Sequence, residues 1–251
     1  MTFSPDQLGG AGRAPALLIV DMQYATASRS GALARLLRRT NREADGEYRF
    51  NRLEQLVLPN QVRLLAGFRL RGLPRIFVSL GGFSSTCREC APRLRTLERE
   101  LANYLGSREY DLLPELSRQQ DELLIGKVSA SAFTSSGLDA ALRNMAITHL
   151  YVAGVSTSEC VDLTARDAAD RGYDTAIVAD AVAEDRPEYH DATLLTFAAF
   201  FGRVVTADEV LTELSGRLTP IGRSTPISPV ATPPERDGMP SRARRAGTPR
   251  G

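Results

Sequence analysis

The sequence predicts an α/β protein of three layers, in which helices cover both faces of a six-stranded, mostly parallel β-sheet. Along residues 14–219, short apolar runs alternate with amphipathic helical patterns, an order typical of strand–helix–strand units. The chain has 251 residues, of which 43% are hydrophobic and 24% charged, so it carries enough apolar material for a full core. The right-handedness of parallel crossovers then places helices on both faces of the sheet.

Six short apolar runs have the length and composition of β-strands. Six strands make a sheet of usual width. The runs are residues 16–20, 75–80, 122–125, 149–153, 175–178 and 203–205.

Amphipathic patterns predict helices between these strands. Pro59 suits a first helical turn, and an apolar face follows it. Ser136 with Asp139, and Thr206 with Glu209, have the spacing of capping boxes and predict the starts of two further helices. The other predicted helices cover residues 94–105, 158–171 and 187–200.

Three segments depart from this regular pattern. Residues 24–48 are rich in Arg and are predicted to form an irregular, lid-like insertion. Residues 1–13 are predicted to be a flexible lead. Residues 220–251 hold half of the 14 prolines and six Arg, which predicts a disordered tail. The functional residues are therefore expected within residues 14–219.

Charge and hydropathy limit the classes of partner. The formal net charge is +1, which provides no global basic field for a nucleic acid or an anionic membrane. No apolar run approaches the length needed to span a bilayer, and the first residues lack the apolar core of a signal peptide. Three cysteines are too few for a disulfide framework. We therefore expect a soluble, cytoplasmic protein with no nucleic-acid or membrane partner.

Three chemically complementary side chains follow predicted strands. Asp21 comes directly after the first strand, Lys127 after the third, and Cys160 a few residues after the fourth, at the start of a helix. Because ligands of parallel sheets bind beyond the carboxyl ends of the strands, these groups are expected to meet in one crevice. Lys127 is the only lysine among 31 basic residues, which suggests a position where arginine cannot replace it.

The three groups have chemistry that fits together. A helix N-terminus and a nearby ammonium both favour the thiolate form of Cys160, which is the nucleophilic form. Asp21 is suited to take a proton from the thiol and to return it to a leaving amine. Taken singly, each residue also has an interpretation without function. Asp21 could be a turn or helix cap, Cys160 a small buried side chain, and Lys127 a surface lysine that remains by chance in an arginine-rich chain.

Three segments of the chain resemble the isochorismatase-like cysteine hydrolases, which include nicotinamidases and the N-carbamoylsarcosine and ureidoacrylate amidohydrolases. The resemblance extends over about residues 14–214 and continues into DAVAEDRPEYHDATL and GRVVTADEVL. The three segments are LLIVDMQ (17–23), GKVSASAF (126–133) and AGVSTSECVDLTARDAADRGY (153–173). The last of these is the most specific to the family.

The resemblance implies a role for each matching residue. Asp21 would be the acid and base, Lys127 its partner and Cys160 the nucleophile. The bond between Val155 and Ser156 matches the place where the family carries a non-proline cis peptide. The backbone amides of Ser156 and Cys160 would form the oxyanion hole. The implied reaction is hydrolysis of an amide or ureido C–N bond through a thioester intermediate.

Departures from the family pattern narrow the prediction further. Nicotinamidases carry a metal cluster of Asp and His after the second strand, whereas the corresponding segment here, GGFSSTCREC, contains no His. No metal and no cofactor are therefore expected. The single Cys87/Cys90 pair lacks the further ligands that a zinc site requires. Gln23 and Phe133 are candidates for contact with the substrate.

Two alternatives to the amidohydrolase prediction remain open at the level of sequence. True isochorismatases hydrolyse an enol ether without using the cysteine, and in that case Cys160 would be idle. A catalytically silent protein would use the same pocket only to bind a small molecule. The presence of Cys160 favours the amidohydrolase branch. The resemblance also implies a homodimer or homotetramer.

Overall fold

A six-stranded β-sheet forms the centre of the computed structural model, which describes residues 14–216. The predicted lead (1–13) and tail (220–251) lie outside the described residues. The strand order is β3-β2-β1-β4-β5-β6, and every neighbouring pair is parallel. The predicted three-layer α/β fold is confirmed. The strands are β1 (Pro15–Val20), β2 (Arg75–Leu80), β3 (Leu123–Lys127), β4 (His149–Val155), β5 (Asp174–Ala183) and β6 (Arg203–Val205).

The sheet separates two apolar layers. In β1, Leu17 and Ile19 pack into one layer, whereas Leu18 and Val20 pack into the other, as the alternation of side chains along a strand requires. All four side chains are buried. Helices α3 (Glu43–Arg52), α4 (Leu58–Leu70) and α9 (Ala207–Leu214) supply apolar side chains to the first layer. The second layer is completed by α5 (Pro92–Glu100), α6 (Leu138–Asn144), α7 (Asp162–Asp170) and α8 (Pro187–Phe200).

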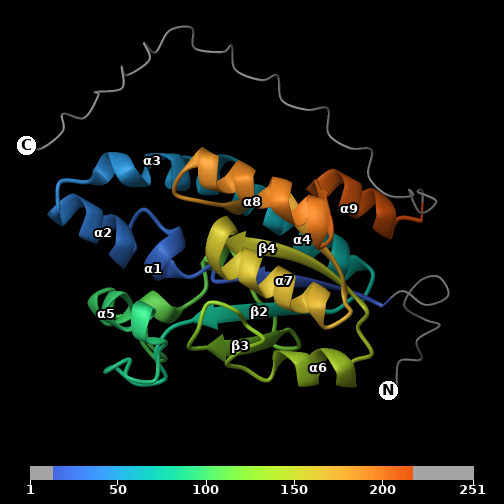
Figure 1. Cartoon of the computed structure of the whole chain (residues 1–251), viewed down its shortest axis with the longest axis horizontal. Helices are drawn as coiled ribbons and strands as arrows, with labels where there is room; N and C mark the ends of the chain where they lie inside the picture. Colours follow the sequence, from blue (N-terminus) through green and yellow to red (C-terminus); the bar gives the residue numbers. More distant parts are fainter. Residues whose placement is uncertain (1–13, 217–251) are drawn as a thin grey trace, which may run out of the picture. The chain divides into compact units, whose positions relative to one another are not determined.

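The strand order creates a crevice at one edge of the sheet. The chain moves from β1 to β2 on one side and returns to β4 on the other, so the loops after β1 and β4 diverge at their carboxyl ends. β4 approaches β1 closely there: Gly154 has a φ of 127°, and a Cβ on it would lie 2.0 Å from the carbonyl oxygen of Val20. Only glycine fits this position. In Figure 1 the arrowheads of β2 and β4 point to the side where α1, α2 and α5 lie.

The segment predicted to be irregular, 24–48, is largely helical, so that prediction was wrong. It contains α1 (Tyr24–Ala27), α2 (Ala32–Arg39) and the start of α3. Arginine is a good helix former, and the buried side of α2 consists of the small residues Ala32 and Ala34. An apolar stripe made of alanine is inconspicuous in the sequence, which explains the error. A π-helical turn at Leu53–Val57 then joins α3 to α4, just before Pro59, which lacks an N–H group.

Two other predicted helix ends differ from the structure, and the predicted start of a third helix is confirmed. The helix predicted over 94–105 ends at Glu100, because Ala102 adopts a left-handed φ of 52° and Asn103 N–H donates back to the carbonyl of Glu98. The predicted box of Ser136 and Asp139 does not form. Gly137 is the N-cap of α6, and Asp139 instead accepts hydrogen bonds from Arg143 and Tyr173. The box of Thr206 and Glu209 forms at α9 as predicted.

In residues 14–216, no helix combines the length and the apolar character that crossing a membrane requires.

A buried ion cluster fixes the start of β3. Glu122, predicted as the first strand residue, precedes the strand, and its fully buried carboxylate accepts hydrogen bonds from Arg69 and Arg75. Burial alone would raise the pKa of Glu122, but these bonds and one from the backbone of Gln119 lower it to about 2. The cluster joins α4 and β2 to the entry of β3, the strand that carries Lys127.

Replacing Glu122 with Gln should lower the free energy of unfolding at pH 7 by about 3 kcal/mol, because two guanidinium groups would lose their buried counter-charge. The lowered pKa means that this contribution is complete above the unfolded value of about 4.3 and is lost as pH falls towards 2. Urea unfolding at pH 7 and pH 3 measures both effects. Asp121→Asn is the matched control, since its side chain is 71% exposed. An equally small change in both variants would contradict the prediction.

Candidate active site

The turn after β1 presents a buried carboxylate. Asp21 adopts a left-handed φ of 55°, a conformation that Asp tolerates better than most residues. Its N–H donates to the carbonyl of Val78 at 2.8 Å, which keeps the residue attached to β2 after β1 has ended. The residue is 4% exposed. The backbone therefore leaves the sheet at Asp21, and the side chain of this residue points into the crevice.

The only lysine of the chain lies at the carboxyl end of β3 and is completely buried. Lys127 pairs with Leu80 of β2 in the sheet, and its long side chain extends past β2 towards β1. Its Nζ lies 2.8 Å from Asp21 Oδ2 and 3.3 Å from Cys160 Sγ, and it donates a third bond to the carbonyl of Ser129 at 3.0 Å. The ammonium thus has three partners and links three segments that are distant in the sequence.

Cys160 lies in a π-helical turn, Thr157–Val161, between β4 and α7. The peptide bond between Val155 and Ser156, just before this turn, is cis, as the family resemblance implied. Glu184 anchors the turn by accepting hydrogen bonds from both the N–H and the Oγ of Ser158, each at 2.7 Å. The nucleophile candidate is therefore held by the loop that follows β5 as well as by its own strand.

His190 braces the same turn from α8. Burial and the charge of Arg52 lower the pKa of His190 to about 4, so its ring is neutral. Its Nε2 faces an Arg52 nitrogen at 3.1 Å and must accept, because guanidinium nitrogens only donate. Nδ1–H then donates to Thr157 Oγ1 at 3.0 Å. This histidine has a structural role beside the site.

Burial controls the protonation of the three candidate groups. It raises the pKa of Asp21, and the ion pair with Lys127 only partly offsets this. Burial acts to lower the pKa of Lys127, but the negative charges of Asp21 and Cys160 outweigh it and raise that pKa. For Cys160, burial dominates over the nearby ammonium and raises the pKa of the thiol. The direction of the Cys160 shift therefore runs against the expectation of a favoured thiolate, because burial outweighs the effect of the ammonium.

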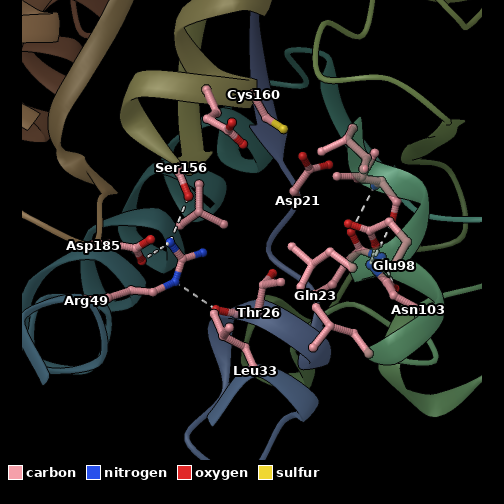
Figure 2. Close-up of a pocket in the computed structure, with 16 residues that line it drawn as sticks. Asp21, Gln23, Thr26, Leu33, Arg49, Glu98, Asn103, Ser156, Cys160 and Asp185 are labelled. Atoms are coloured by element: carbon pink, nitrogen blue, oxygen red, sulfur yellow. Dashed lines mark hydrogen bonds and ion pairs between the residues drawn. The ribbon is translucent and has the colours of Figure 1, made fainter. Parts of the chain in front are cut away.

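A cavity of about 150 Å³ opens directly onto these groups. Figure 2 shows the sulfur of Cys160 and the carboxylate of Asp21 pointing towards each other at one end of it. Its volume suits a small organic molecule. In residues 14–216, no cluster of three His, Cys, Asp or Glu side chains is placed to hold a metal ion. The lining comes from α1–α3, α5 and the loops after β1, β2, β4 and β5, with Leu33, Leu94, Leu97 and Leu101 among its apolar members.

The two predicted substrate contacts have different locations. Gln23 lines the cavity, but its amide is engaged within the protein: Nε2 donates to Asn103 Oδ1 and to the carbonyl of Tyr110, and Oε1 accepts from Leu80 N–H. Phe133 does not line the cavity. It packs against the ring of Tyr173 in the apolar core. The geometry therefore gives Phe133 no contact with a ligand in this cavity.

Sequence reasoning missed a buried acid in the cavity wall. Glu98 is 2% exposed, and its Oε2 accepts a hydrogen bond from Asn103 Nδ2 at 2.7 Å. Burial raises the pKa of Glu98 to about 7, despite the bond from Asn103. Its spacing from Leu94 and Leu101 places it on the apolar face of α5, and an acid on such a face is the signal that was overlooked.

A buried arginine on the opposite wall was also missed. Arg49 of α3 lines the cavity, and its side chain is only 4% exposed. It donates to Ser156 Oγ at 2.7 Å, to Asp185 Oδ1 at 3.1 Å and to the carbonyl of Thr26 at 2.9 Å. With 30 arginines in the chain, nothing in the sequence distinguishes this one.

Comparison with known proteins identifies the family. Residues 15–209 match the family model of the isochorismatase domain. A ureidoacrylate amidohydrolase, RutB, of Pseudomonas syringae pv. syringae is 31% identical over 223 residues, which cover 83% of this chain and 85% of that protein. The chain belongs to the isochorismatase family.

Other isochorismatase-family relatives are similar over comparable lengths. The RutB ureidoacrylate amidohydrolase of Serratia proteamaculans is 30% identical and covers 86% of this chain and 88% of its own length. The crystal structure of a cysteine hydrolase from Pseudomonas syringae pv. phaseolicola has a TM-score of 0.67 at 22% identity, covering 82% and 94% of the two chains. That of N-carbamoylsarcosine amidase from Thermoplasma acidophilum has a TM-score of 0.59 at 23% identity, covering 78% and 97%. These structures share the fold.

Glu98 should make the folded protein less stable as pH rises from about 4 to 7. Its pKa is about 4.3 when unfolded and about 7 when folded, so in this window the folded state binds more protons. Between pH 5 and pH 8, the free energy of unfolding of the wild type should fall relative to that of Glu98→Gln by on the order of 2 kcal/mol. Urea titrations at the two pH values measure this difference.

The matched control for this pH dependence is Glu100→Gln, on the same helix, with a side chain that is 44% exposed. Its pH dependence should follow that of the wild type. A Glu98→Gln protein with the same pH dependence as the wild type would show that the buried carboxyl does not titrate near neutrality.

Proposed function

We propose that this protein is a cysteine-dependent hydrolase that cleaves the C–N bond of a small amide or ureido compound. The observation that carries the proposal is the buried Lys127 ammonium, within 2.8 Å of Asp21 Oδ2 and 3.3 Å of Cys160 Sγ, at the end of a cavity of suitable size. The relatives named as ureidoacrylate amidohydrolases, at 30–31% identity, support a ureido or amide substrate.

The first half of the reaction begins with a thiol, because burial keeps Cys160 protonated at rest. As Sγ attacks the carbonyl carbon, its proton passes to Asp21, whose raised pKa makes it a stronger base than an exposed aspartate. The carbonyl electron pair moves to oxygen, where the amides of Ser156 and Cys160 are the proposed donors. Asp21 then gives its proton to the leaving nitrogen as the C–N bond breaks, which leaves a thioester on Cys160.

The second half of the reaction reverses these roles. Asp21 takes a proton from a water molecule, and the resulting hydroxyl group adds to the thioester carbon. The S–C bond breaks, and the sulfur regains the proton from Asp21. Lys127 holds the Asp21 carboxylate in position and provides a compensating positive charge whenever the sulfur carries negative charge. Apart from the chain and its substrate, the proton balance requires only this water molecule.

Replacing Cys160 with Ala should reduce the release of ammonia from amide and ureido compounds by about 10³-fold or more, because the bond-forming atom is removed. The measurement is ammonia release over a panel of nicotinamide, carbamoyl amino acids, ureidoacrylate and biuret. Cys90→Ala is the control, since Cys90 is buried but does not line the cavity. If Cys160→Ala retained hydrolysis of isochorismate, the enol-ether alternative would replace this proposal. If the wild type hydrolysed none of these compounds, the silent binding protein would be favoured.

Replacing Lys127 with Arg should lower kcat/KM by about 100-fold or more, although the charge is kept. The planar guanidinium is larger than the ammonium and cannot reach Asp21, Cys160 and the Ser129 carbonyl from a fully buried position without displacing them. Steady-state kinetics with circular dichroism as a check on folding provide the measurement. Arg143→Lys, at an exposed ion pair on α6, is the reciprocal control and should have wild-type rates. Near-normal turnover by Lys127→Arg would remove the proposed role of the ammonium.

A further inference from the structure

Arg49 has hydrogen-bonding capacity that the protein does not use. A guanidinium has five N–H donors. One N–H, on Nε, donates to Thr26, and the two on Nη1 donate to Ser156 and Asp185. Within residues 14–216, no residue accepts a hydrogen bond from the two N–H groups on Nη2. Figure 2 shows this remaining nitrogen pointing from the wall into the cavity.

The counter-ion of Arg49 is poorly placed to neutralise it. The guanidinium side chain is 4% exposed, whereas the side chain of Asp185 is 56% exposed. Asp185 therefore interacts strongly with solvent, while the cation is removed from it. A buried cation that is only partly compensated attracts an anion, and a free guanidinium N–H suits a charge-assisted hydrogen bond to a carboxylate oxygen.

The distribution of charged residues around the cavity favours an anion only at the wall formed by Arg49. Arg49 is the only cationic residue that lines the cavity within residues 14–216. The Lys127 ammonium, which lies behind the cavity, is already paired with Asp21. Figure 2 shows Glu98 on the opposite side of the cavity from Arg49, with Asp21 and Cys160 between them. A carboxylate would be repelled at the Glu98 wall once that group ionises, whereas N–H groups would find an acceptor there.

We propose that Arg49 forms an anion-binding subsite and that the substrate is a small ureido acid. Its carboxylate would accept a charge-assisted hydrogen bond from Nη2 of Arg49, its carbonyl carbon would lie at Cys160 Sγ, and its terminal N–H groups would face Glu98. This inference rests on the proposed hydrolase function for the placement of the carbonyl group. Arg49 is then a specificity-determining residue, and its bond to Ser156 Oγ joins the anion subsite to the turn that carries Cys160.

The test measures binding through protection of Cys160, so that it does not require turnover. Alkylation of Cys160 by iodoacetamide is followed by mass spectrometry in the presence of 3-ureidopropionate or of its uncharged counterpart 3-methylbutylurea. In the wild type, 3-ureidopropionate should protect at lower concentration than the neutral urea. In Arg49→Gln, its protection constant should weaken by about 10- to 100-fold, the value of a lost charge-assisted bond. Protection by 3-methylbutylurea should change by less than about 3-fold.

Two further variants separate this subsite from a structural role. Arg29→Gln removes the same charge from the same helical insertion, at a residue that does not line the cavity, and should leave the preference for the anion unchanged. Asp185→Asn removes the exposed counter-ion and should tighten protection by 3-ureidopropionate about 2- to 5-fold, with no gain for the neutral urea. This variant keeps the proposal testable if Arg49→Gln fails to fold.

The outcomes also distinguish the subsite from the reaction. Equal protection by the two ureas in the wild type, or an equal loss of both in Arg49→Gln, would overturn the subsite and leave Arg49 as a brace for Ser156. An absence of any gain for 3-ureidopropionate in Asp185→Asn would also overturn it. Selective protection without ammonia release from any ureido compound would sustain the subsite while the proposed hydrolase function failed.

Discussion

The burial of one ammonium group between a carboxylate and a thiol is the constraint on which the rest of this site depends. A charge removed from water is costly unless it is paired and hydrogen-bonded. Lys127 meets this requirement with three partners, taken from the turn after β1, the loop after β3 and the turn after β4. Those segments must therefore converge for the charge to be tolerated, and their convergence defines the floor of the cavity.

The strand order makes this convergence possible. Lys127 lies two strands away from Asp21, and its side chain is long enough to extend past the end of β2 and reach it. On the other side of β1, Gly154 lets β4 approach so closely that no side chain fits between them. The ion cluster around Glu122 fixes the entry of β3 and so the position of its last residue. Features at the far end of the sheet thus determine the geometry at the edge that carries the candidate site.

Much of this could be predicted from the sequence, because strands and strand-end residues have local signals. Apolar runs indicated the six strands, and the polar residue after each run indicated Asp21 and Lys127. The missed features lacked such signals. Arg49 is one of 30 arginines, the helices of the insertion bury alanine rather than large apolar residues, and the effect of burial on Cys160 depends on tertiary packing. Glu98 was detectable, since an acid in line with Leu94 and Leu101 interrupts an apolar face.

The lone lysine makes opening of the folded structure detectable by chemical labelling. Because Lys127 carries the only side-chain amine of the chain and is fully enclosed, a reagent that acylates amines finds no lysine on the folded surface. Its side chain becomes accessible only when β3 separates from its neighbours or the molecule opens further. Acylation at this position therefore counts the openings of this edge of the sheet, and each acylation permanently removes the positive charge around which the edge is organised.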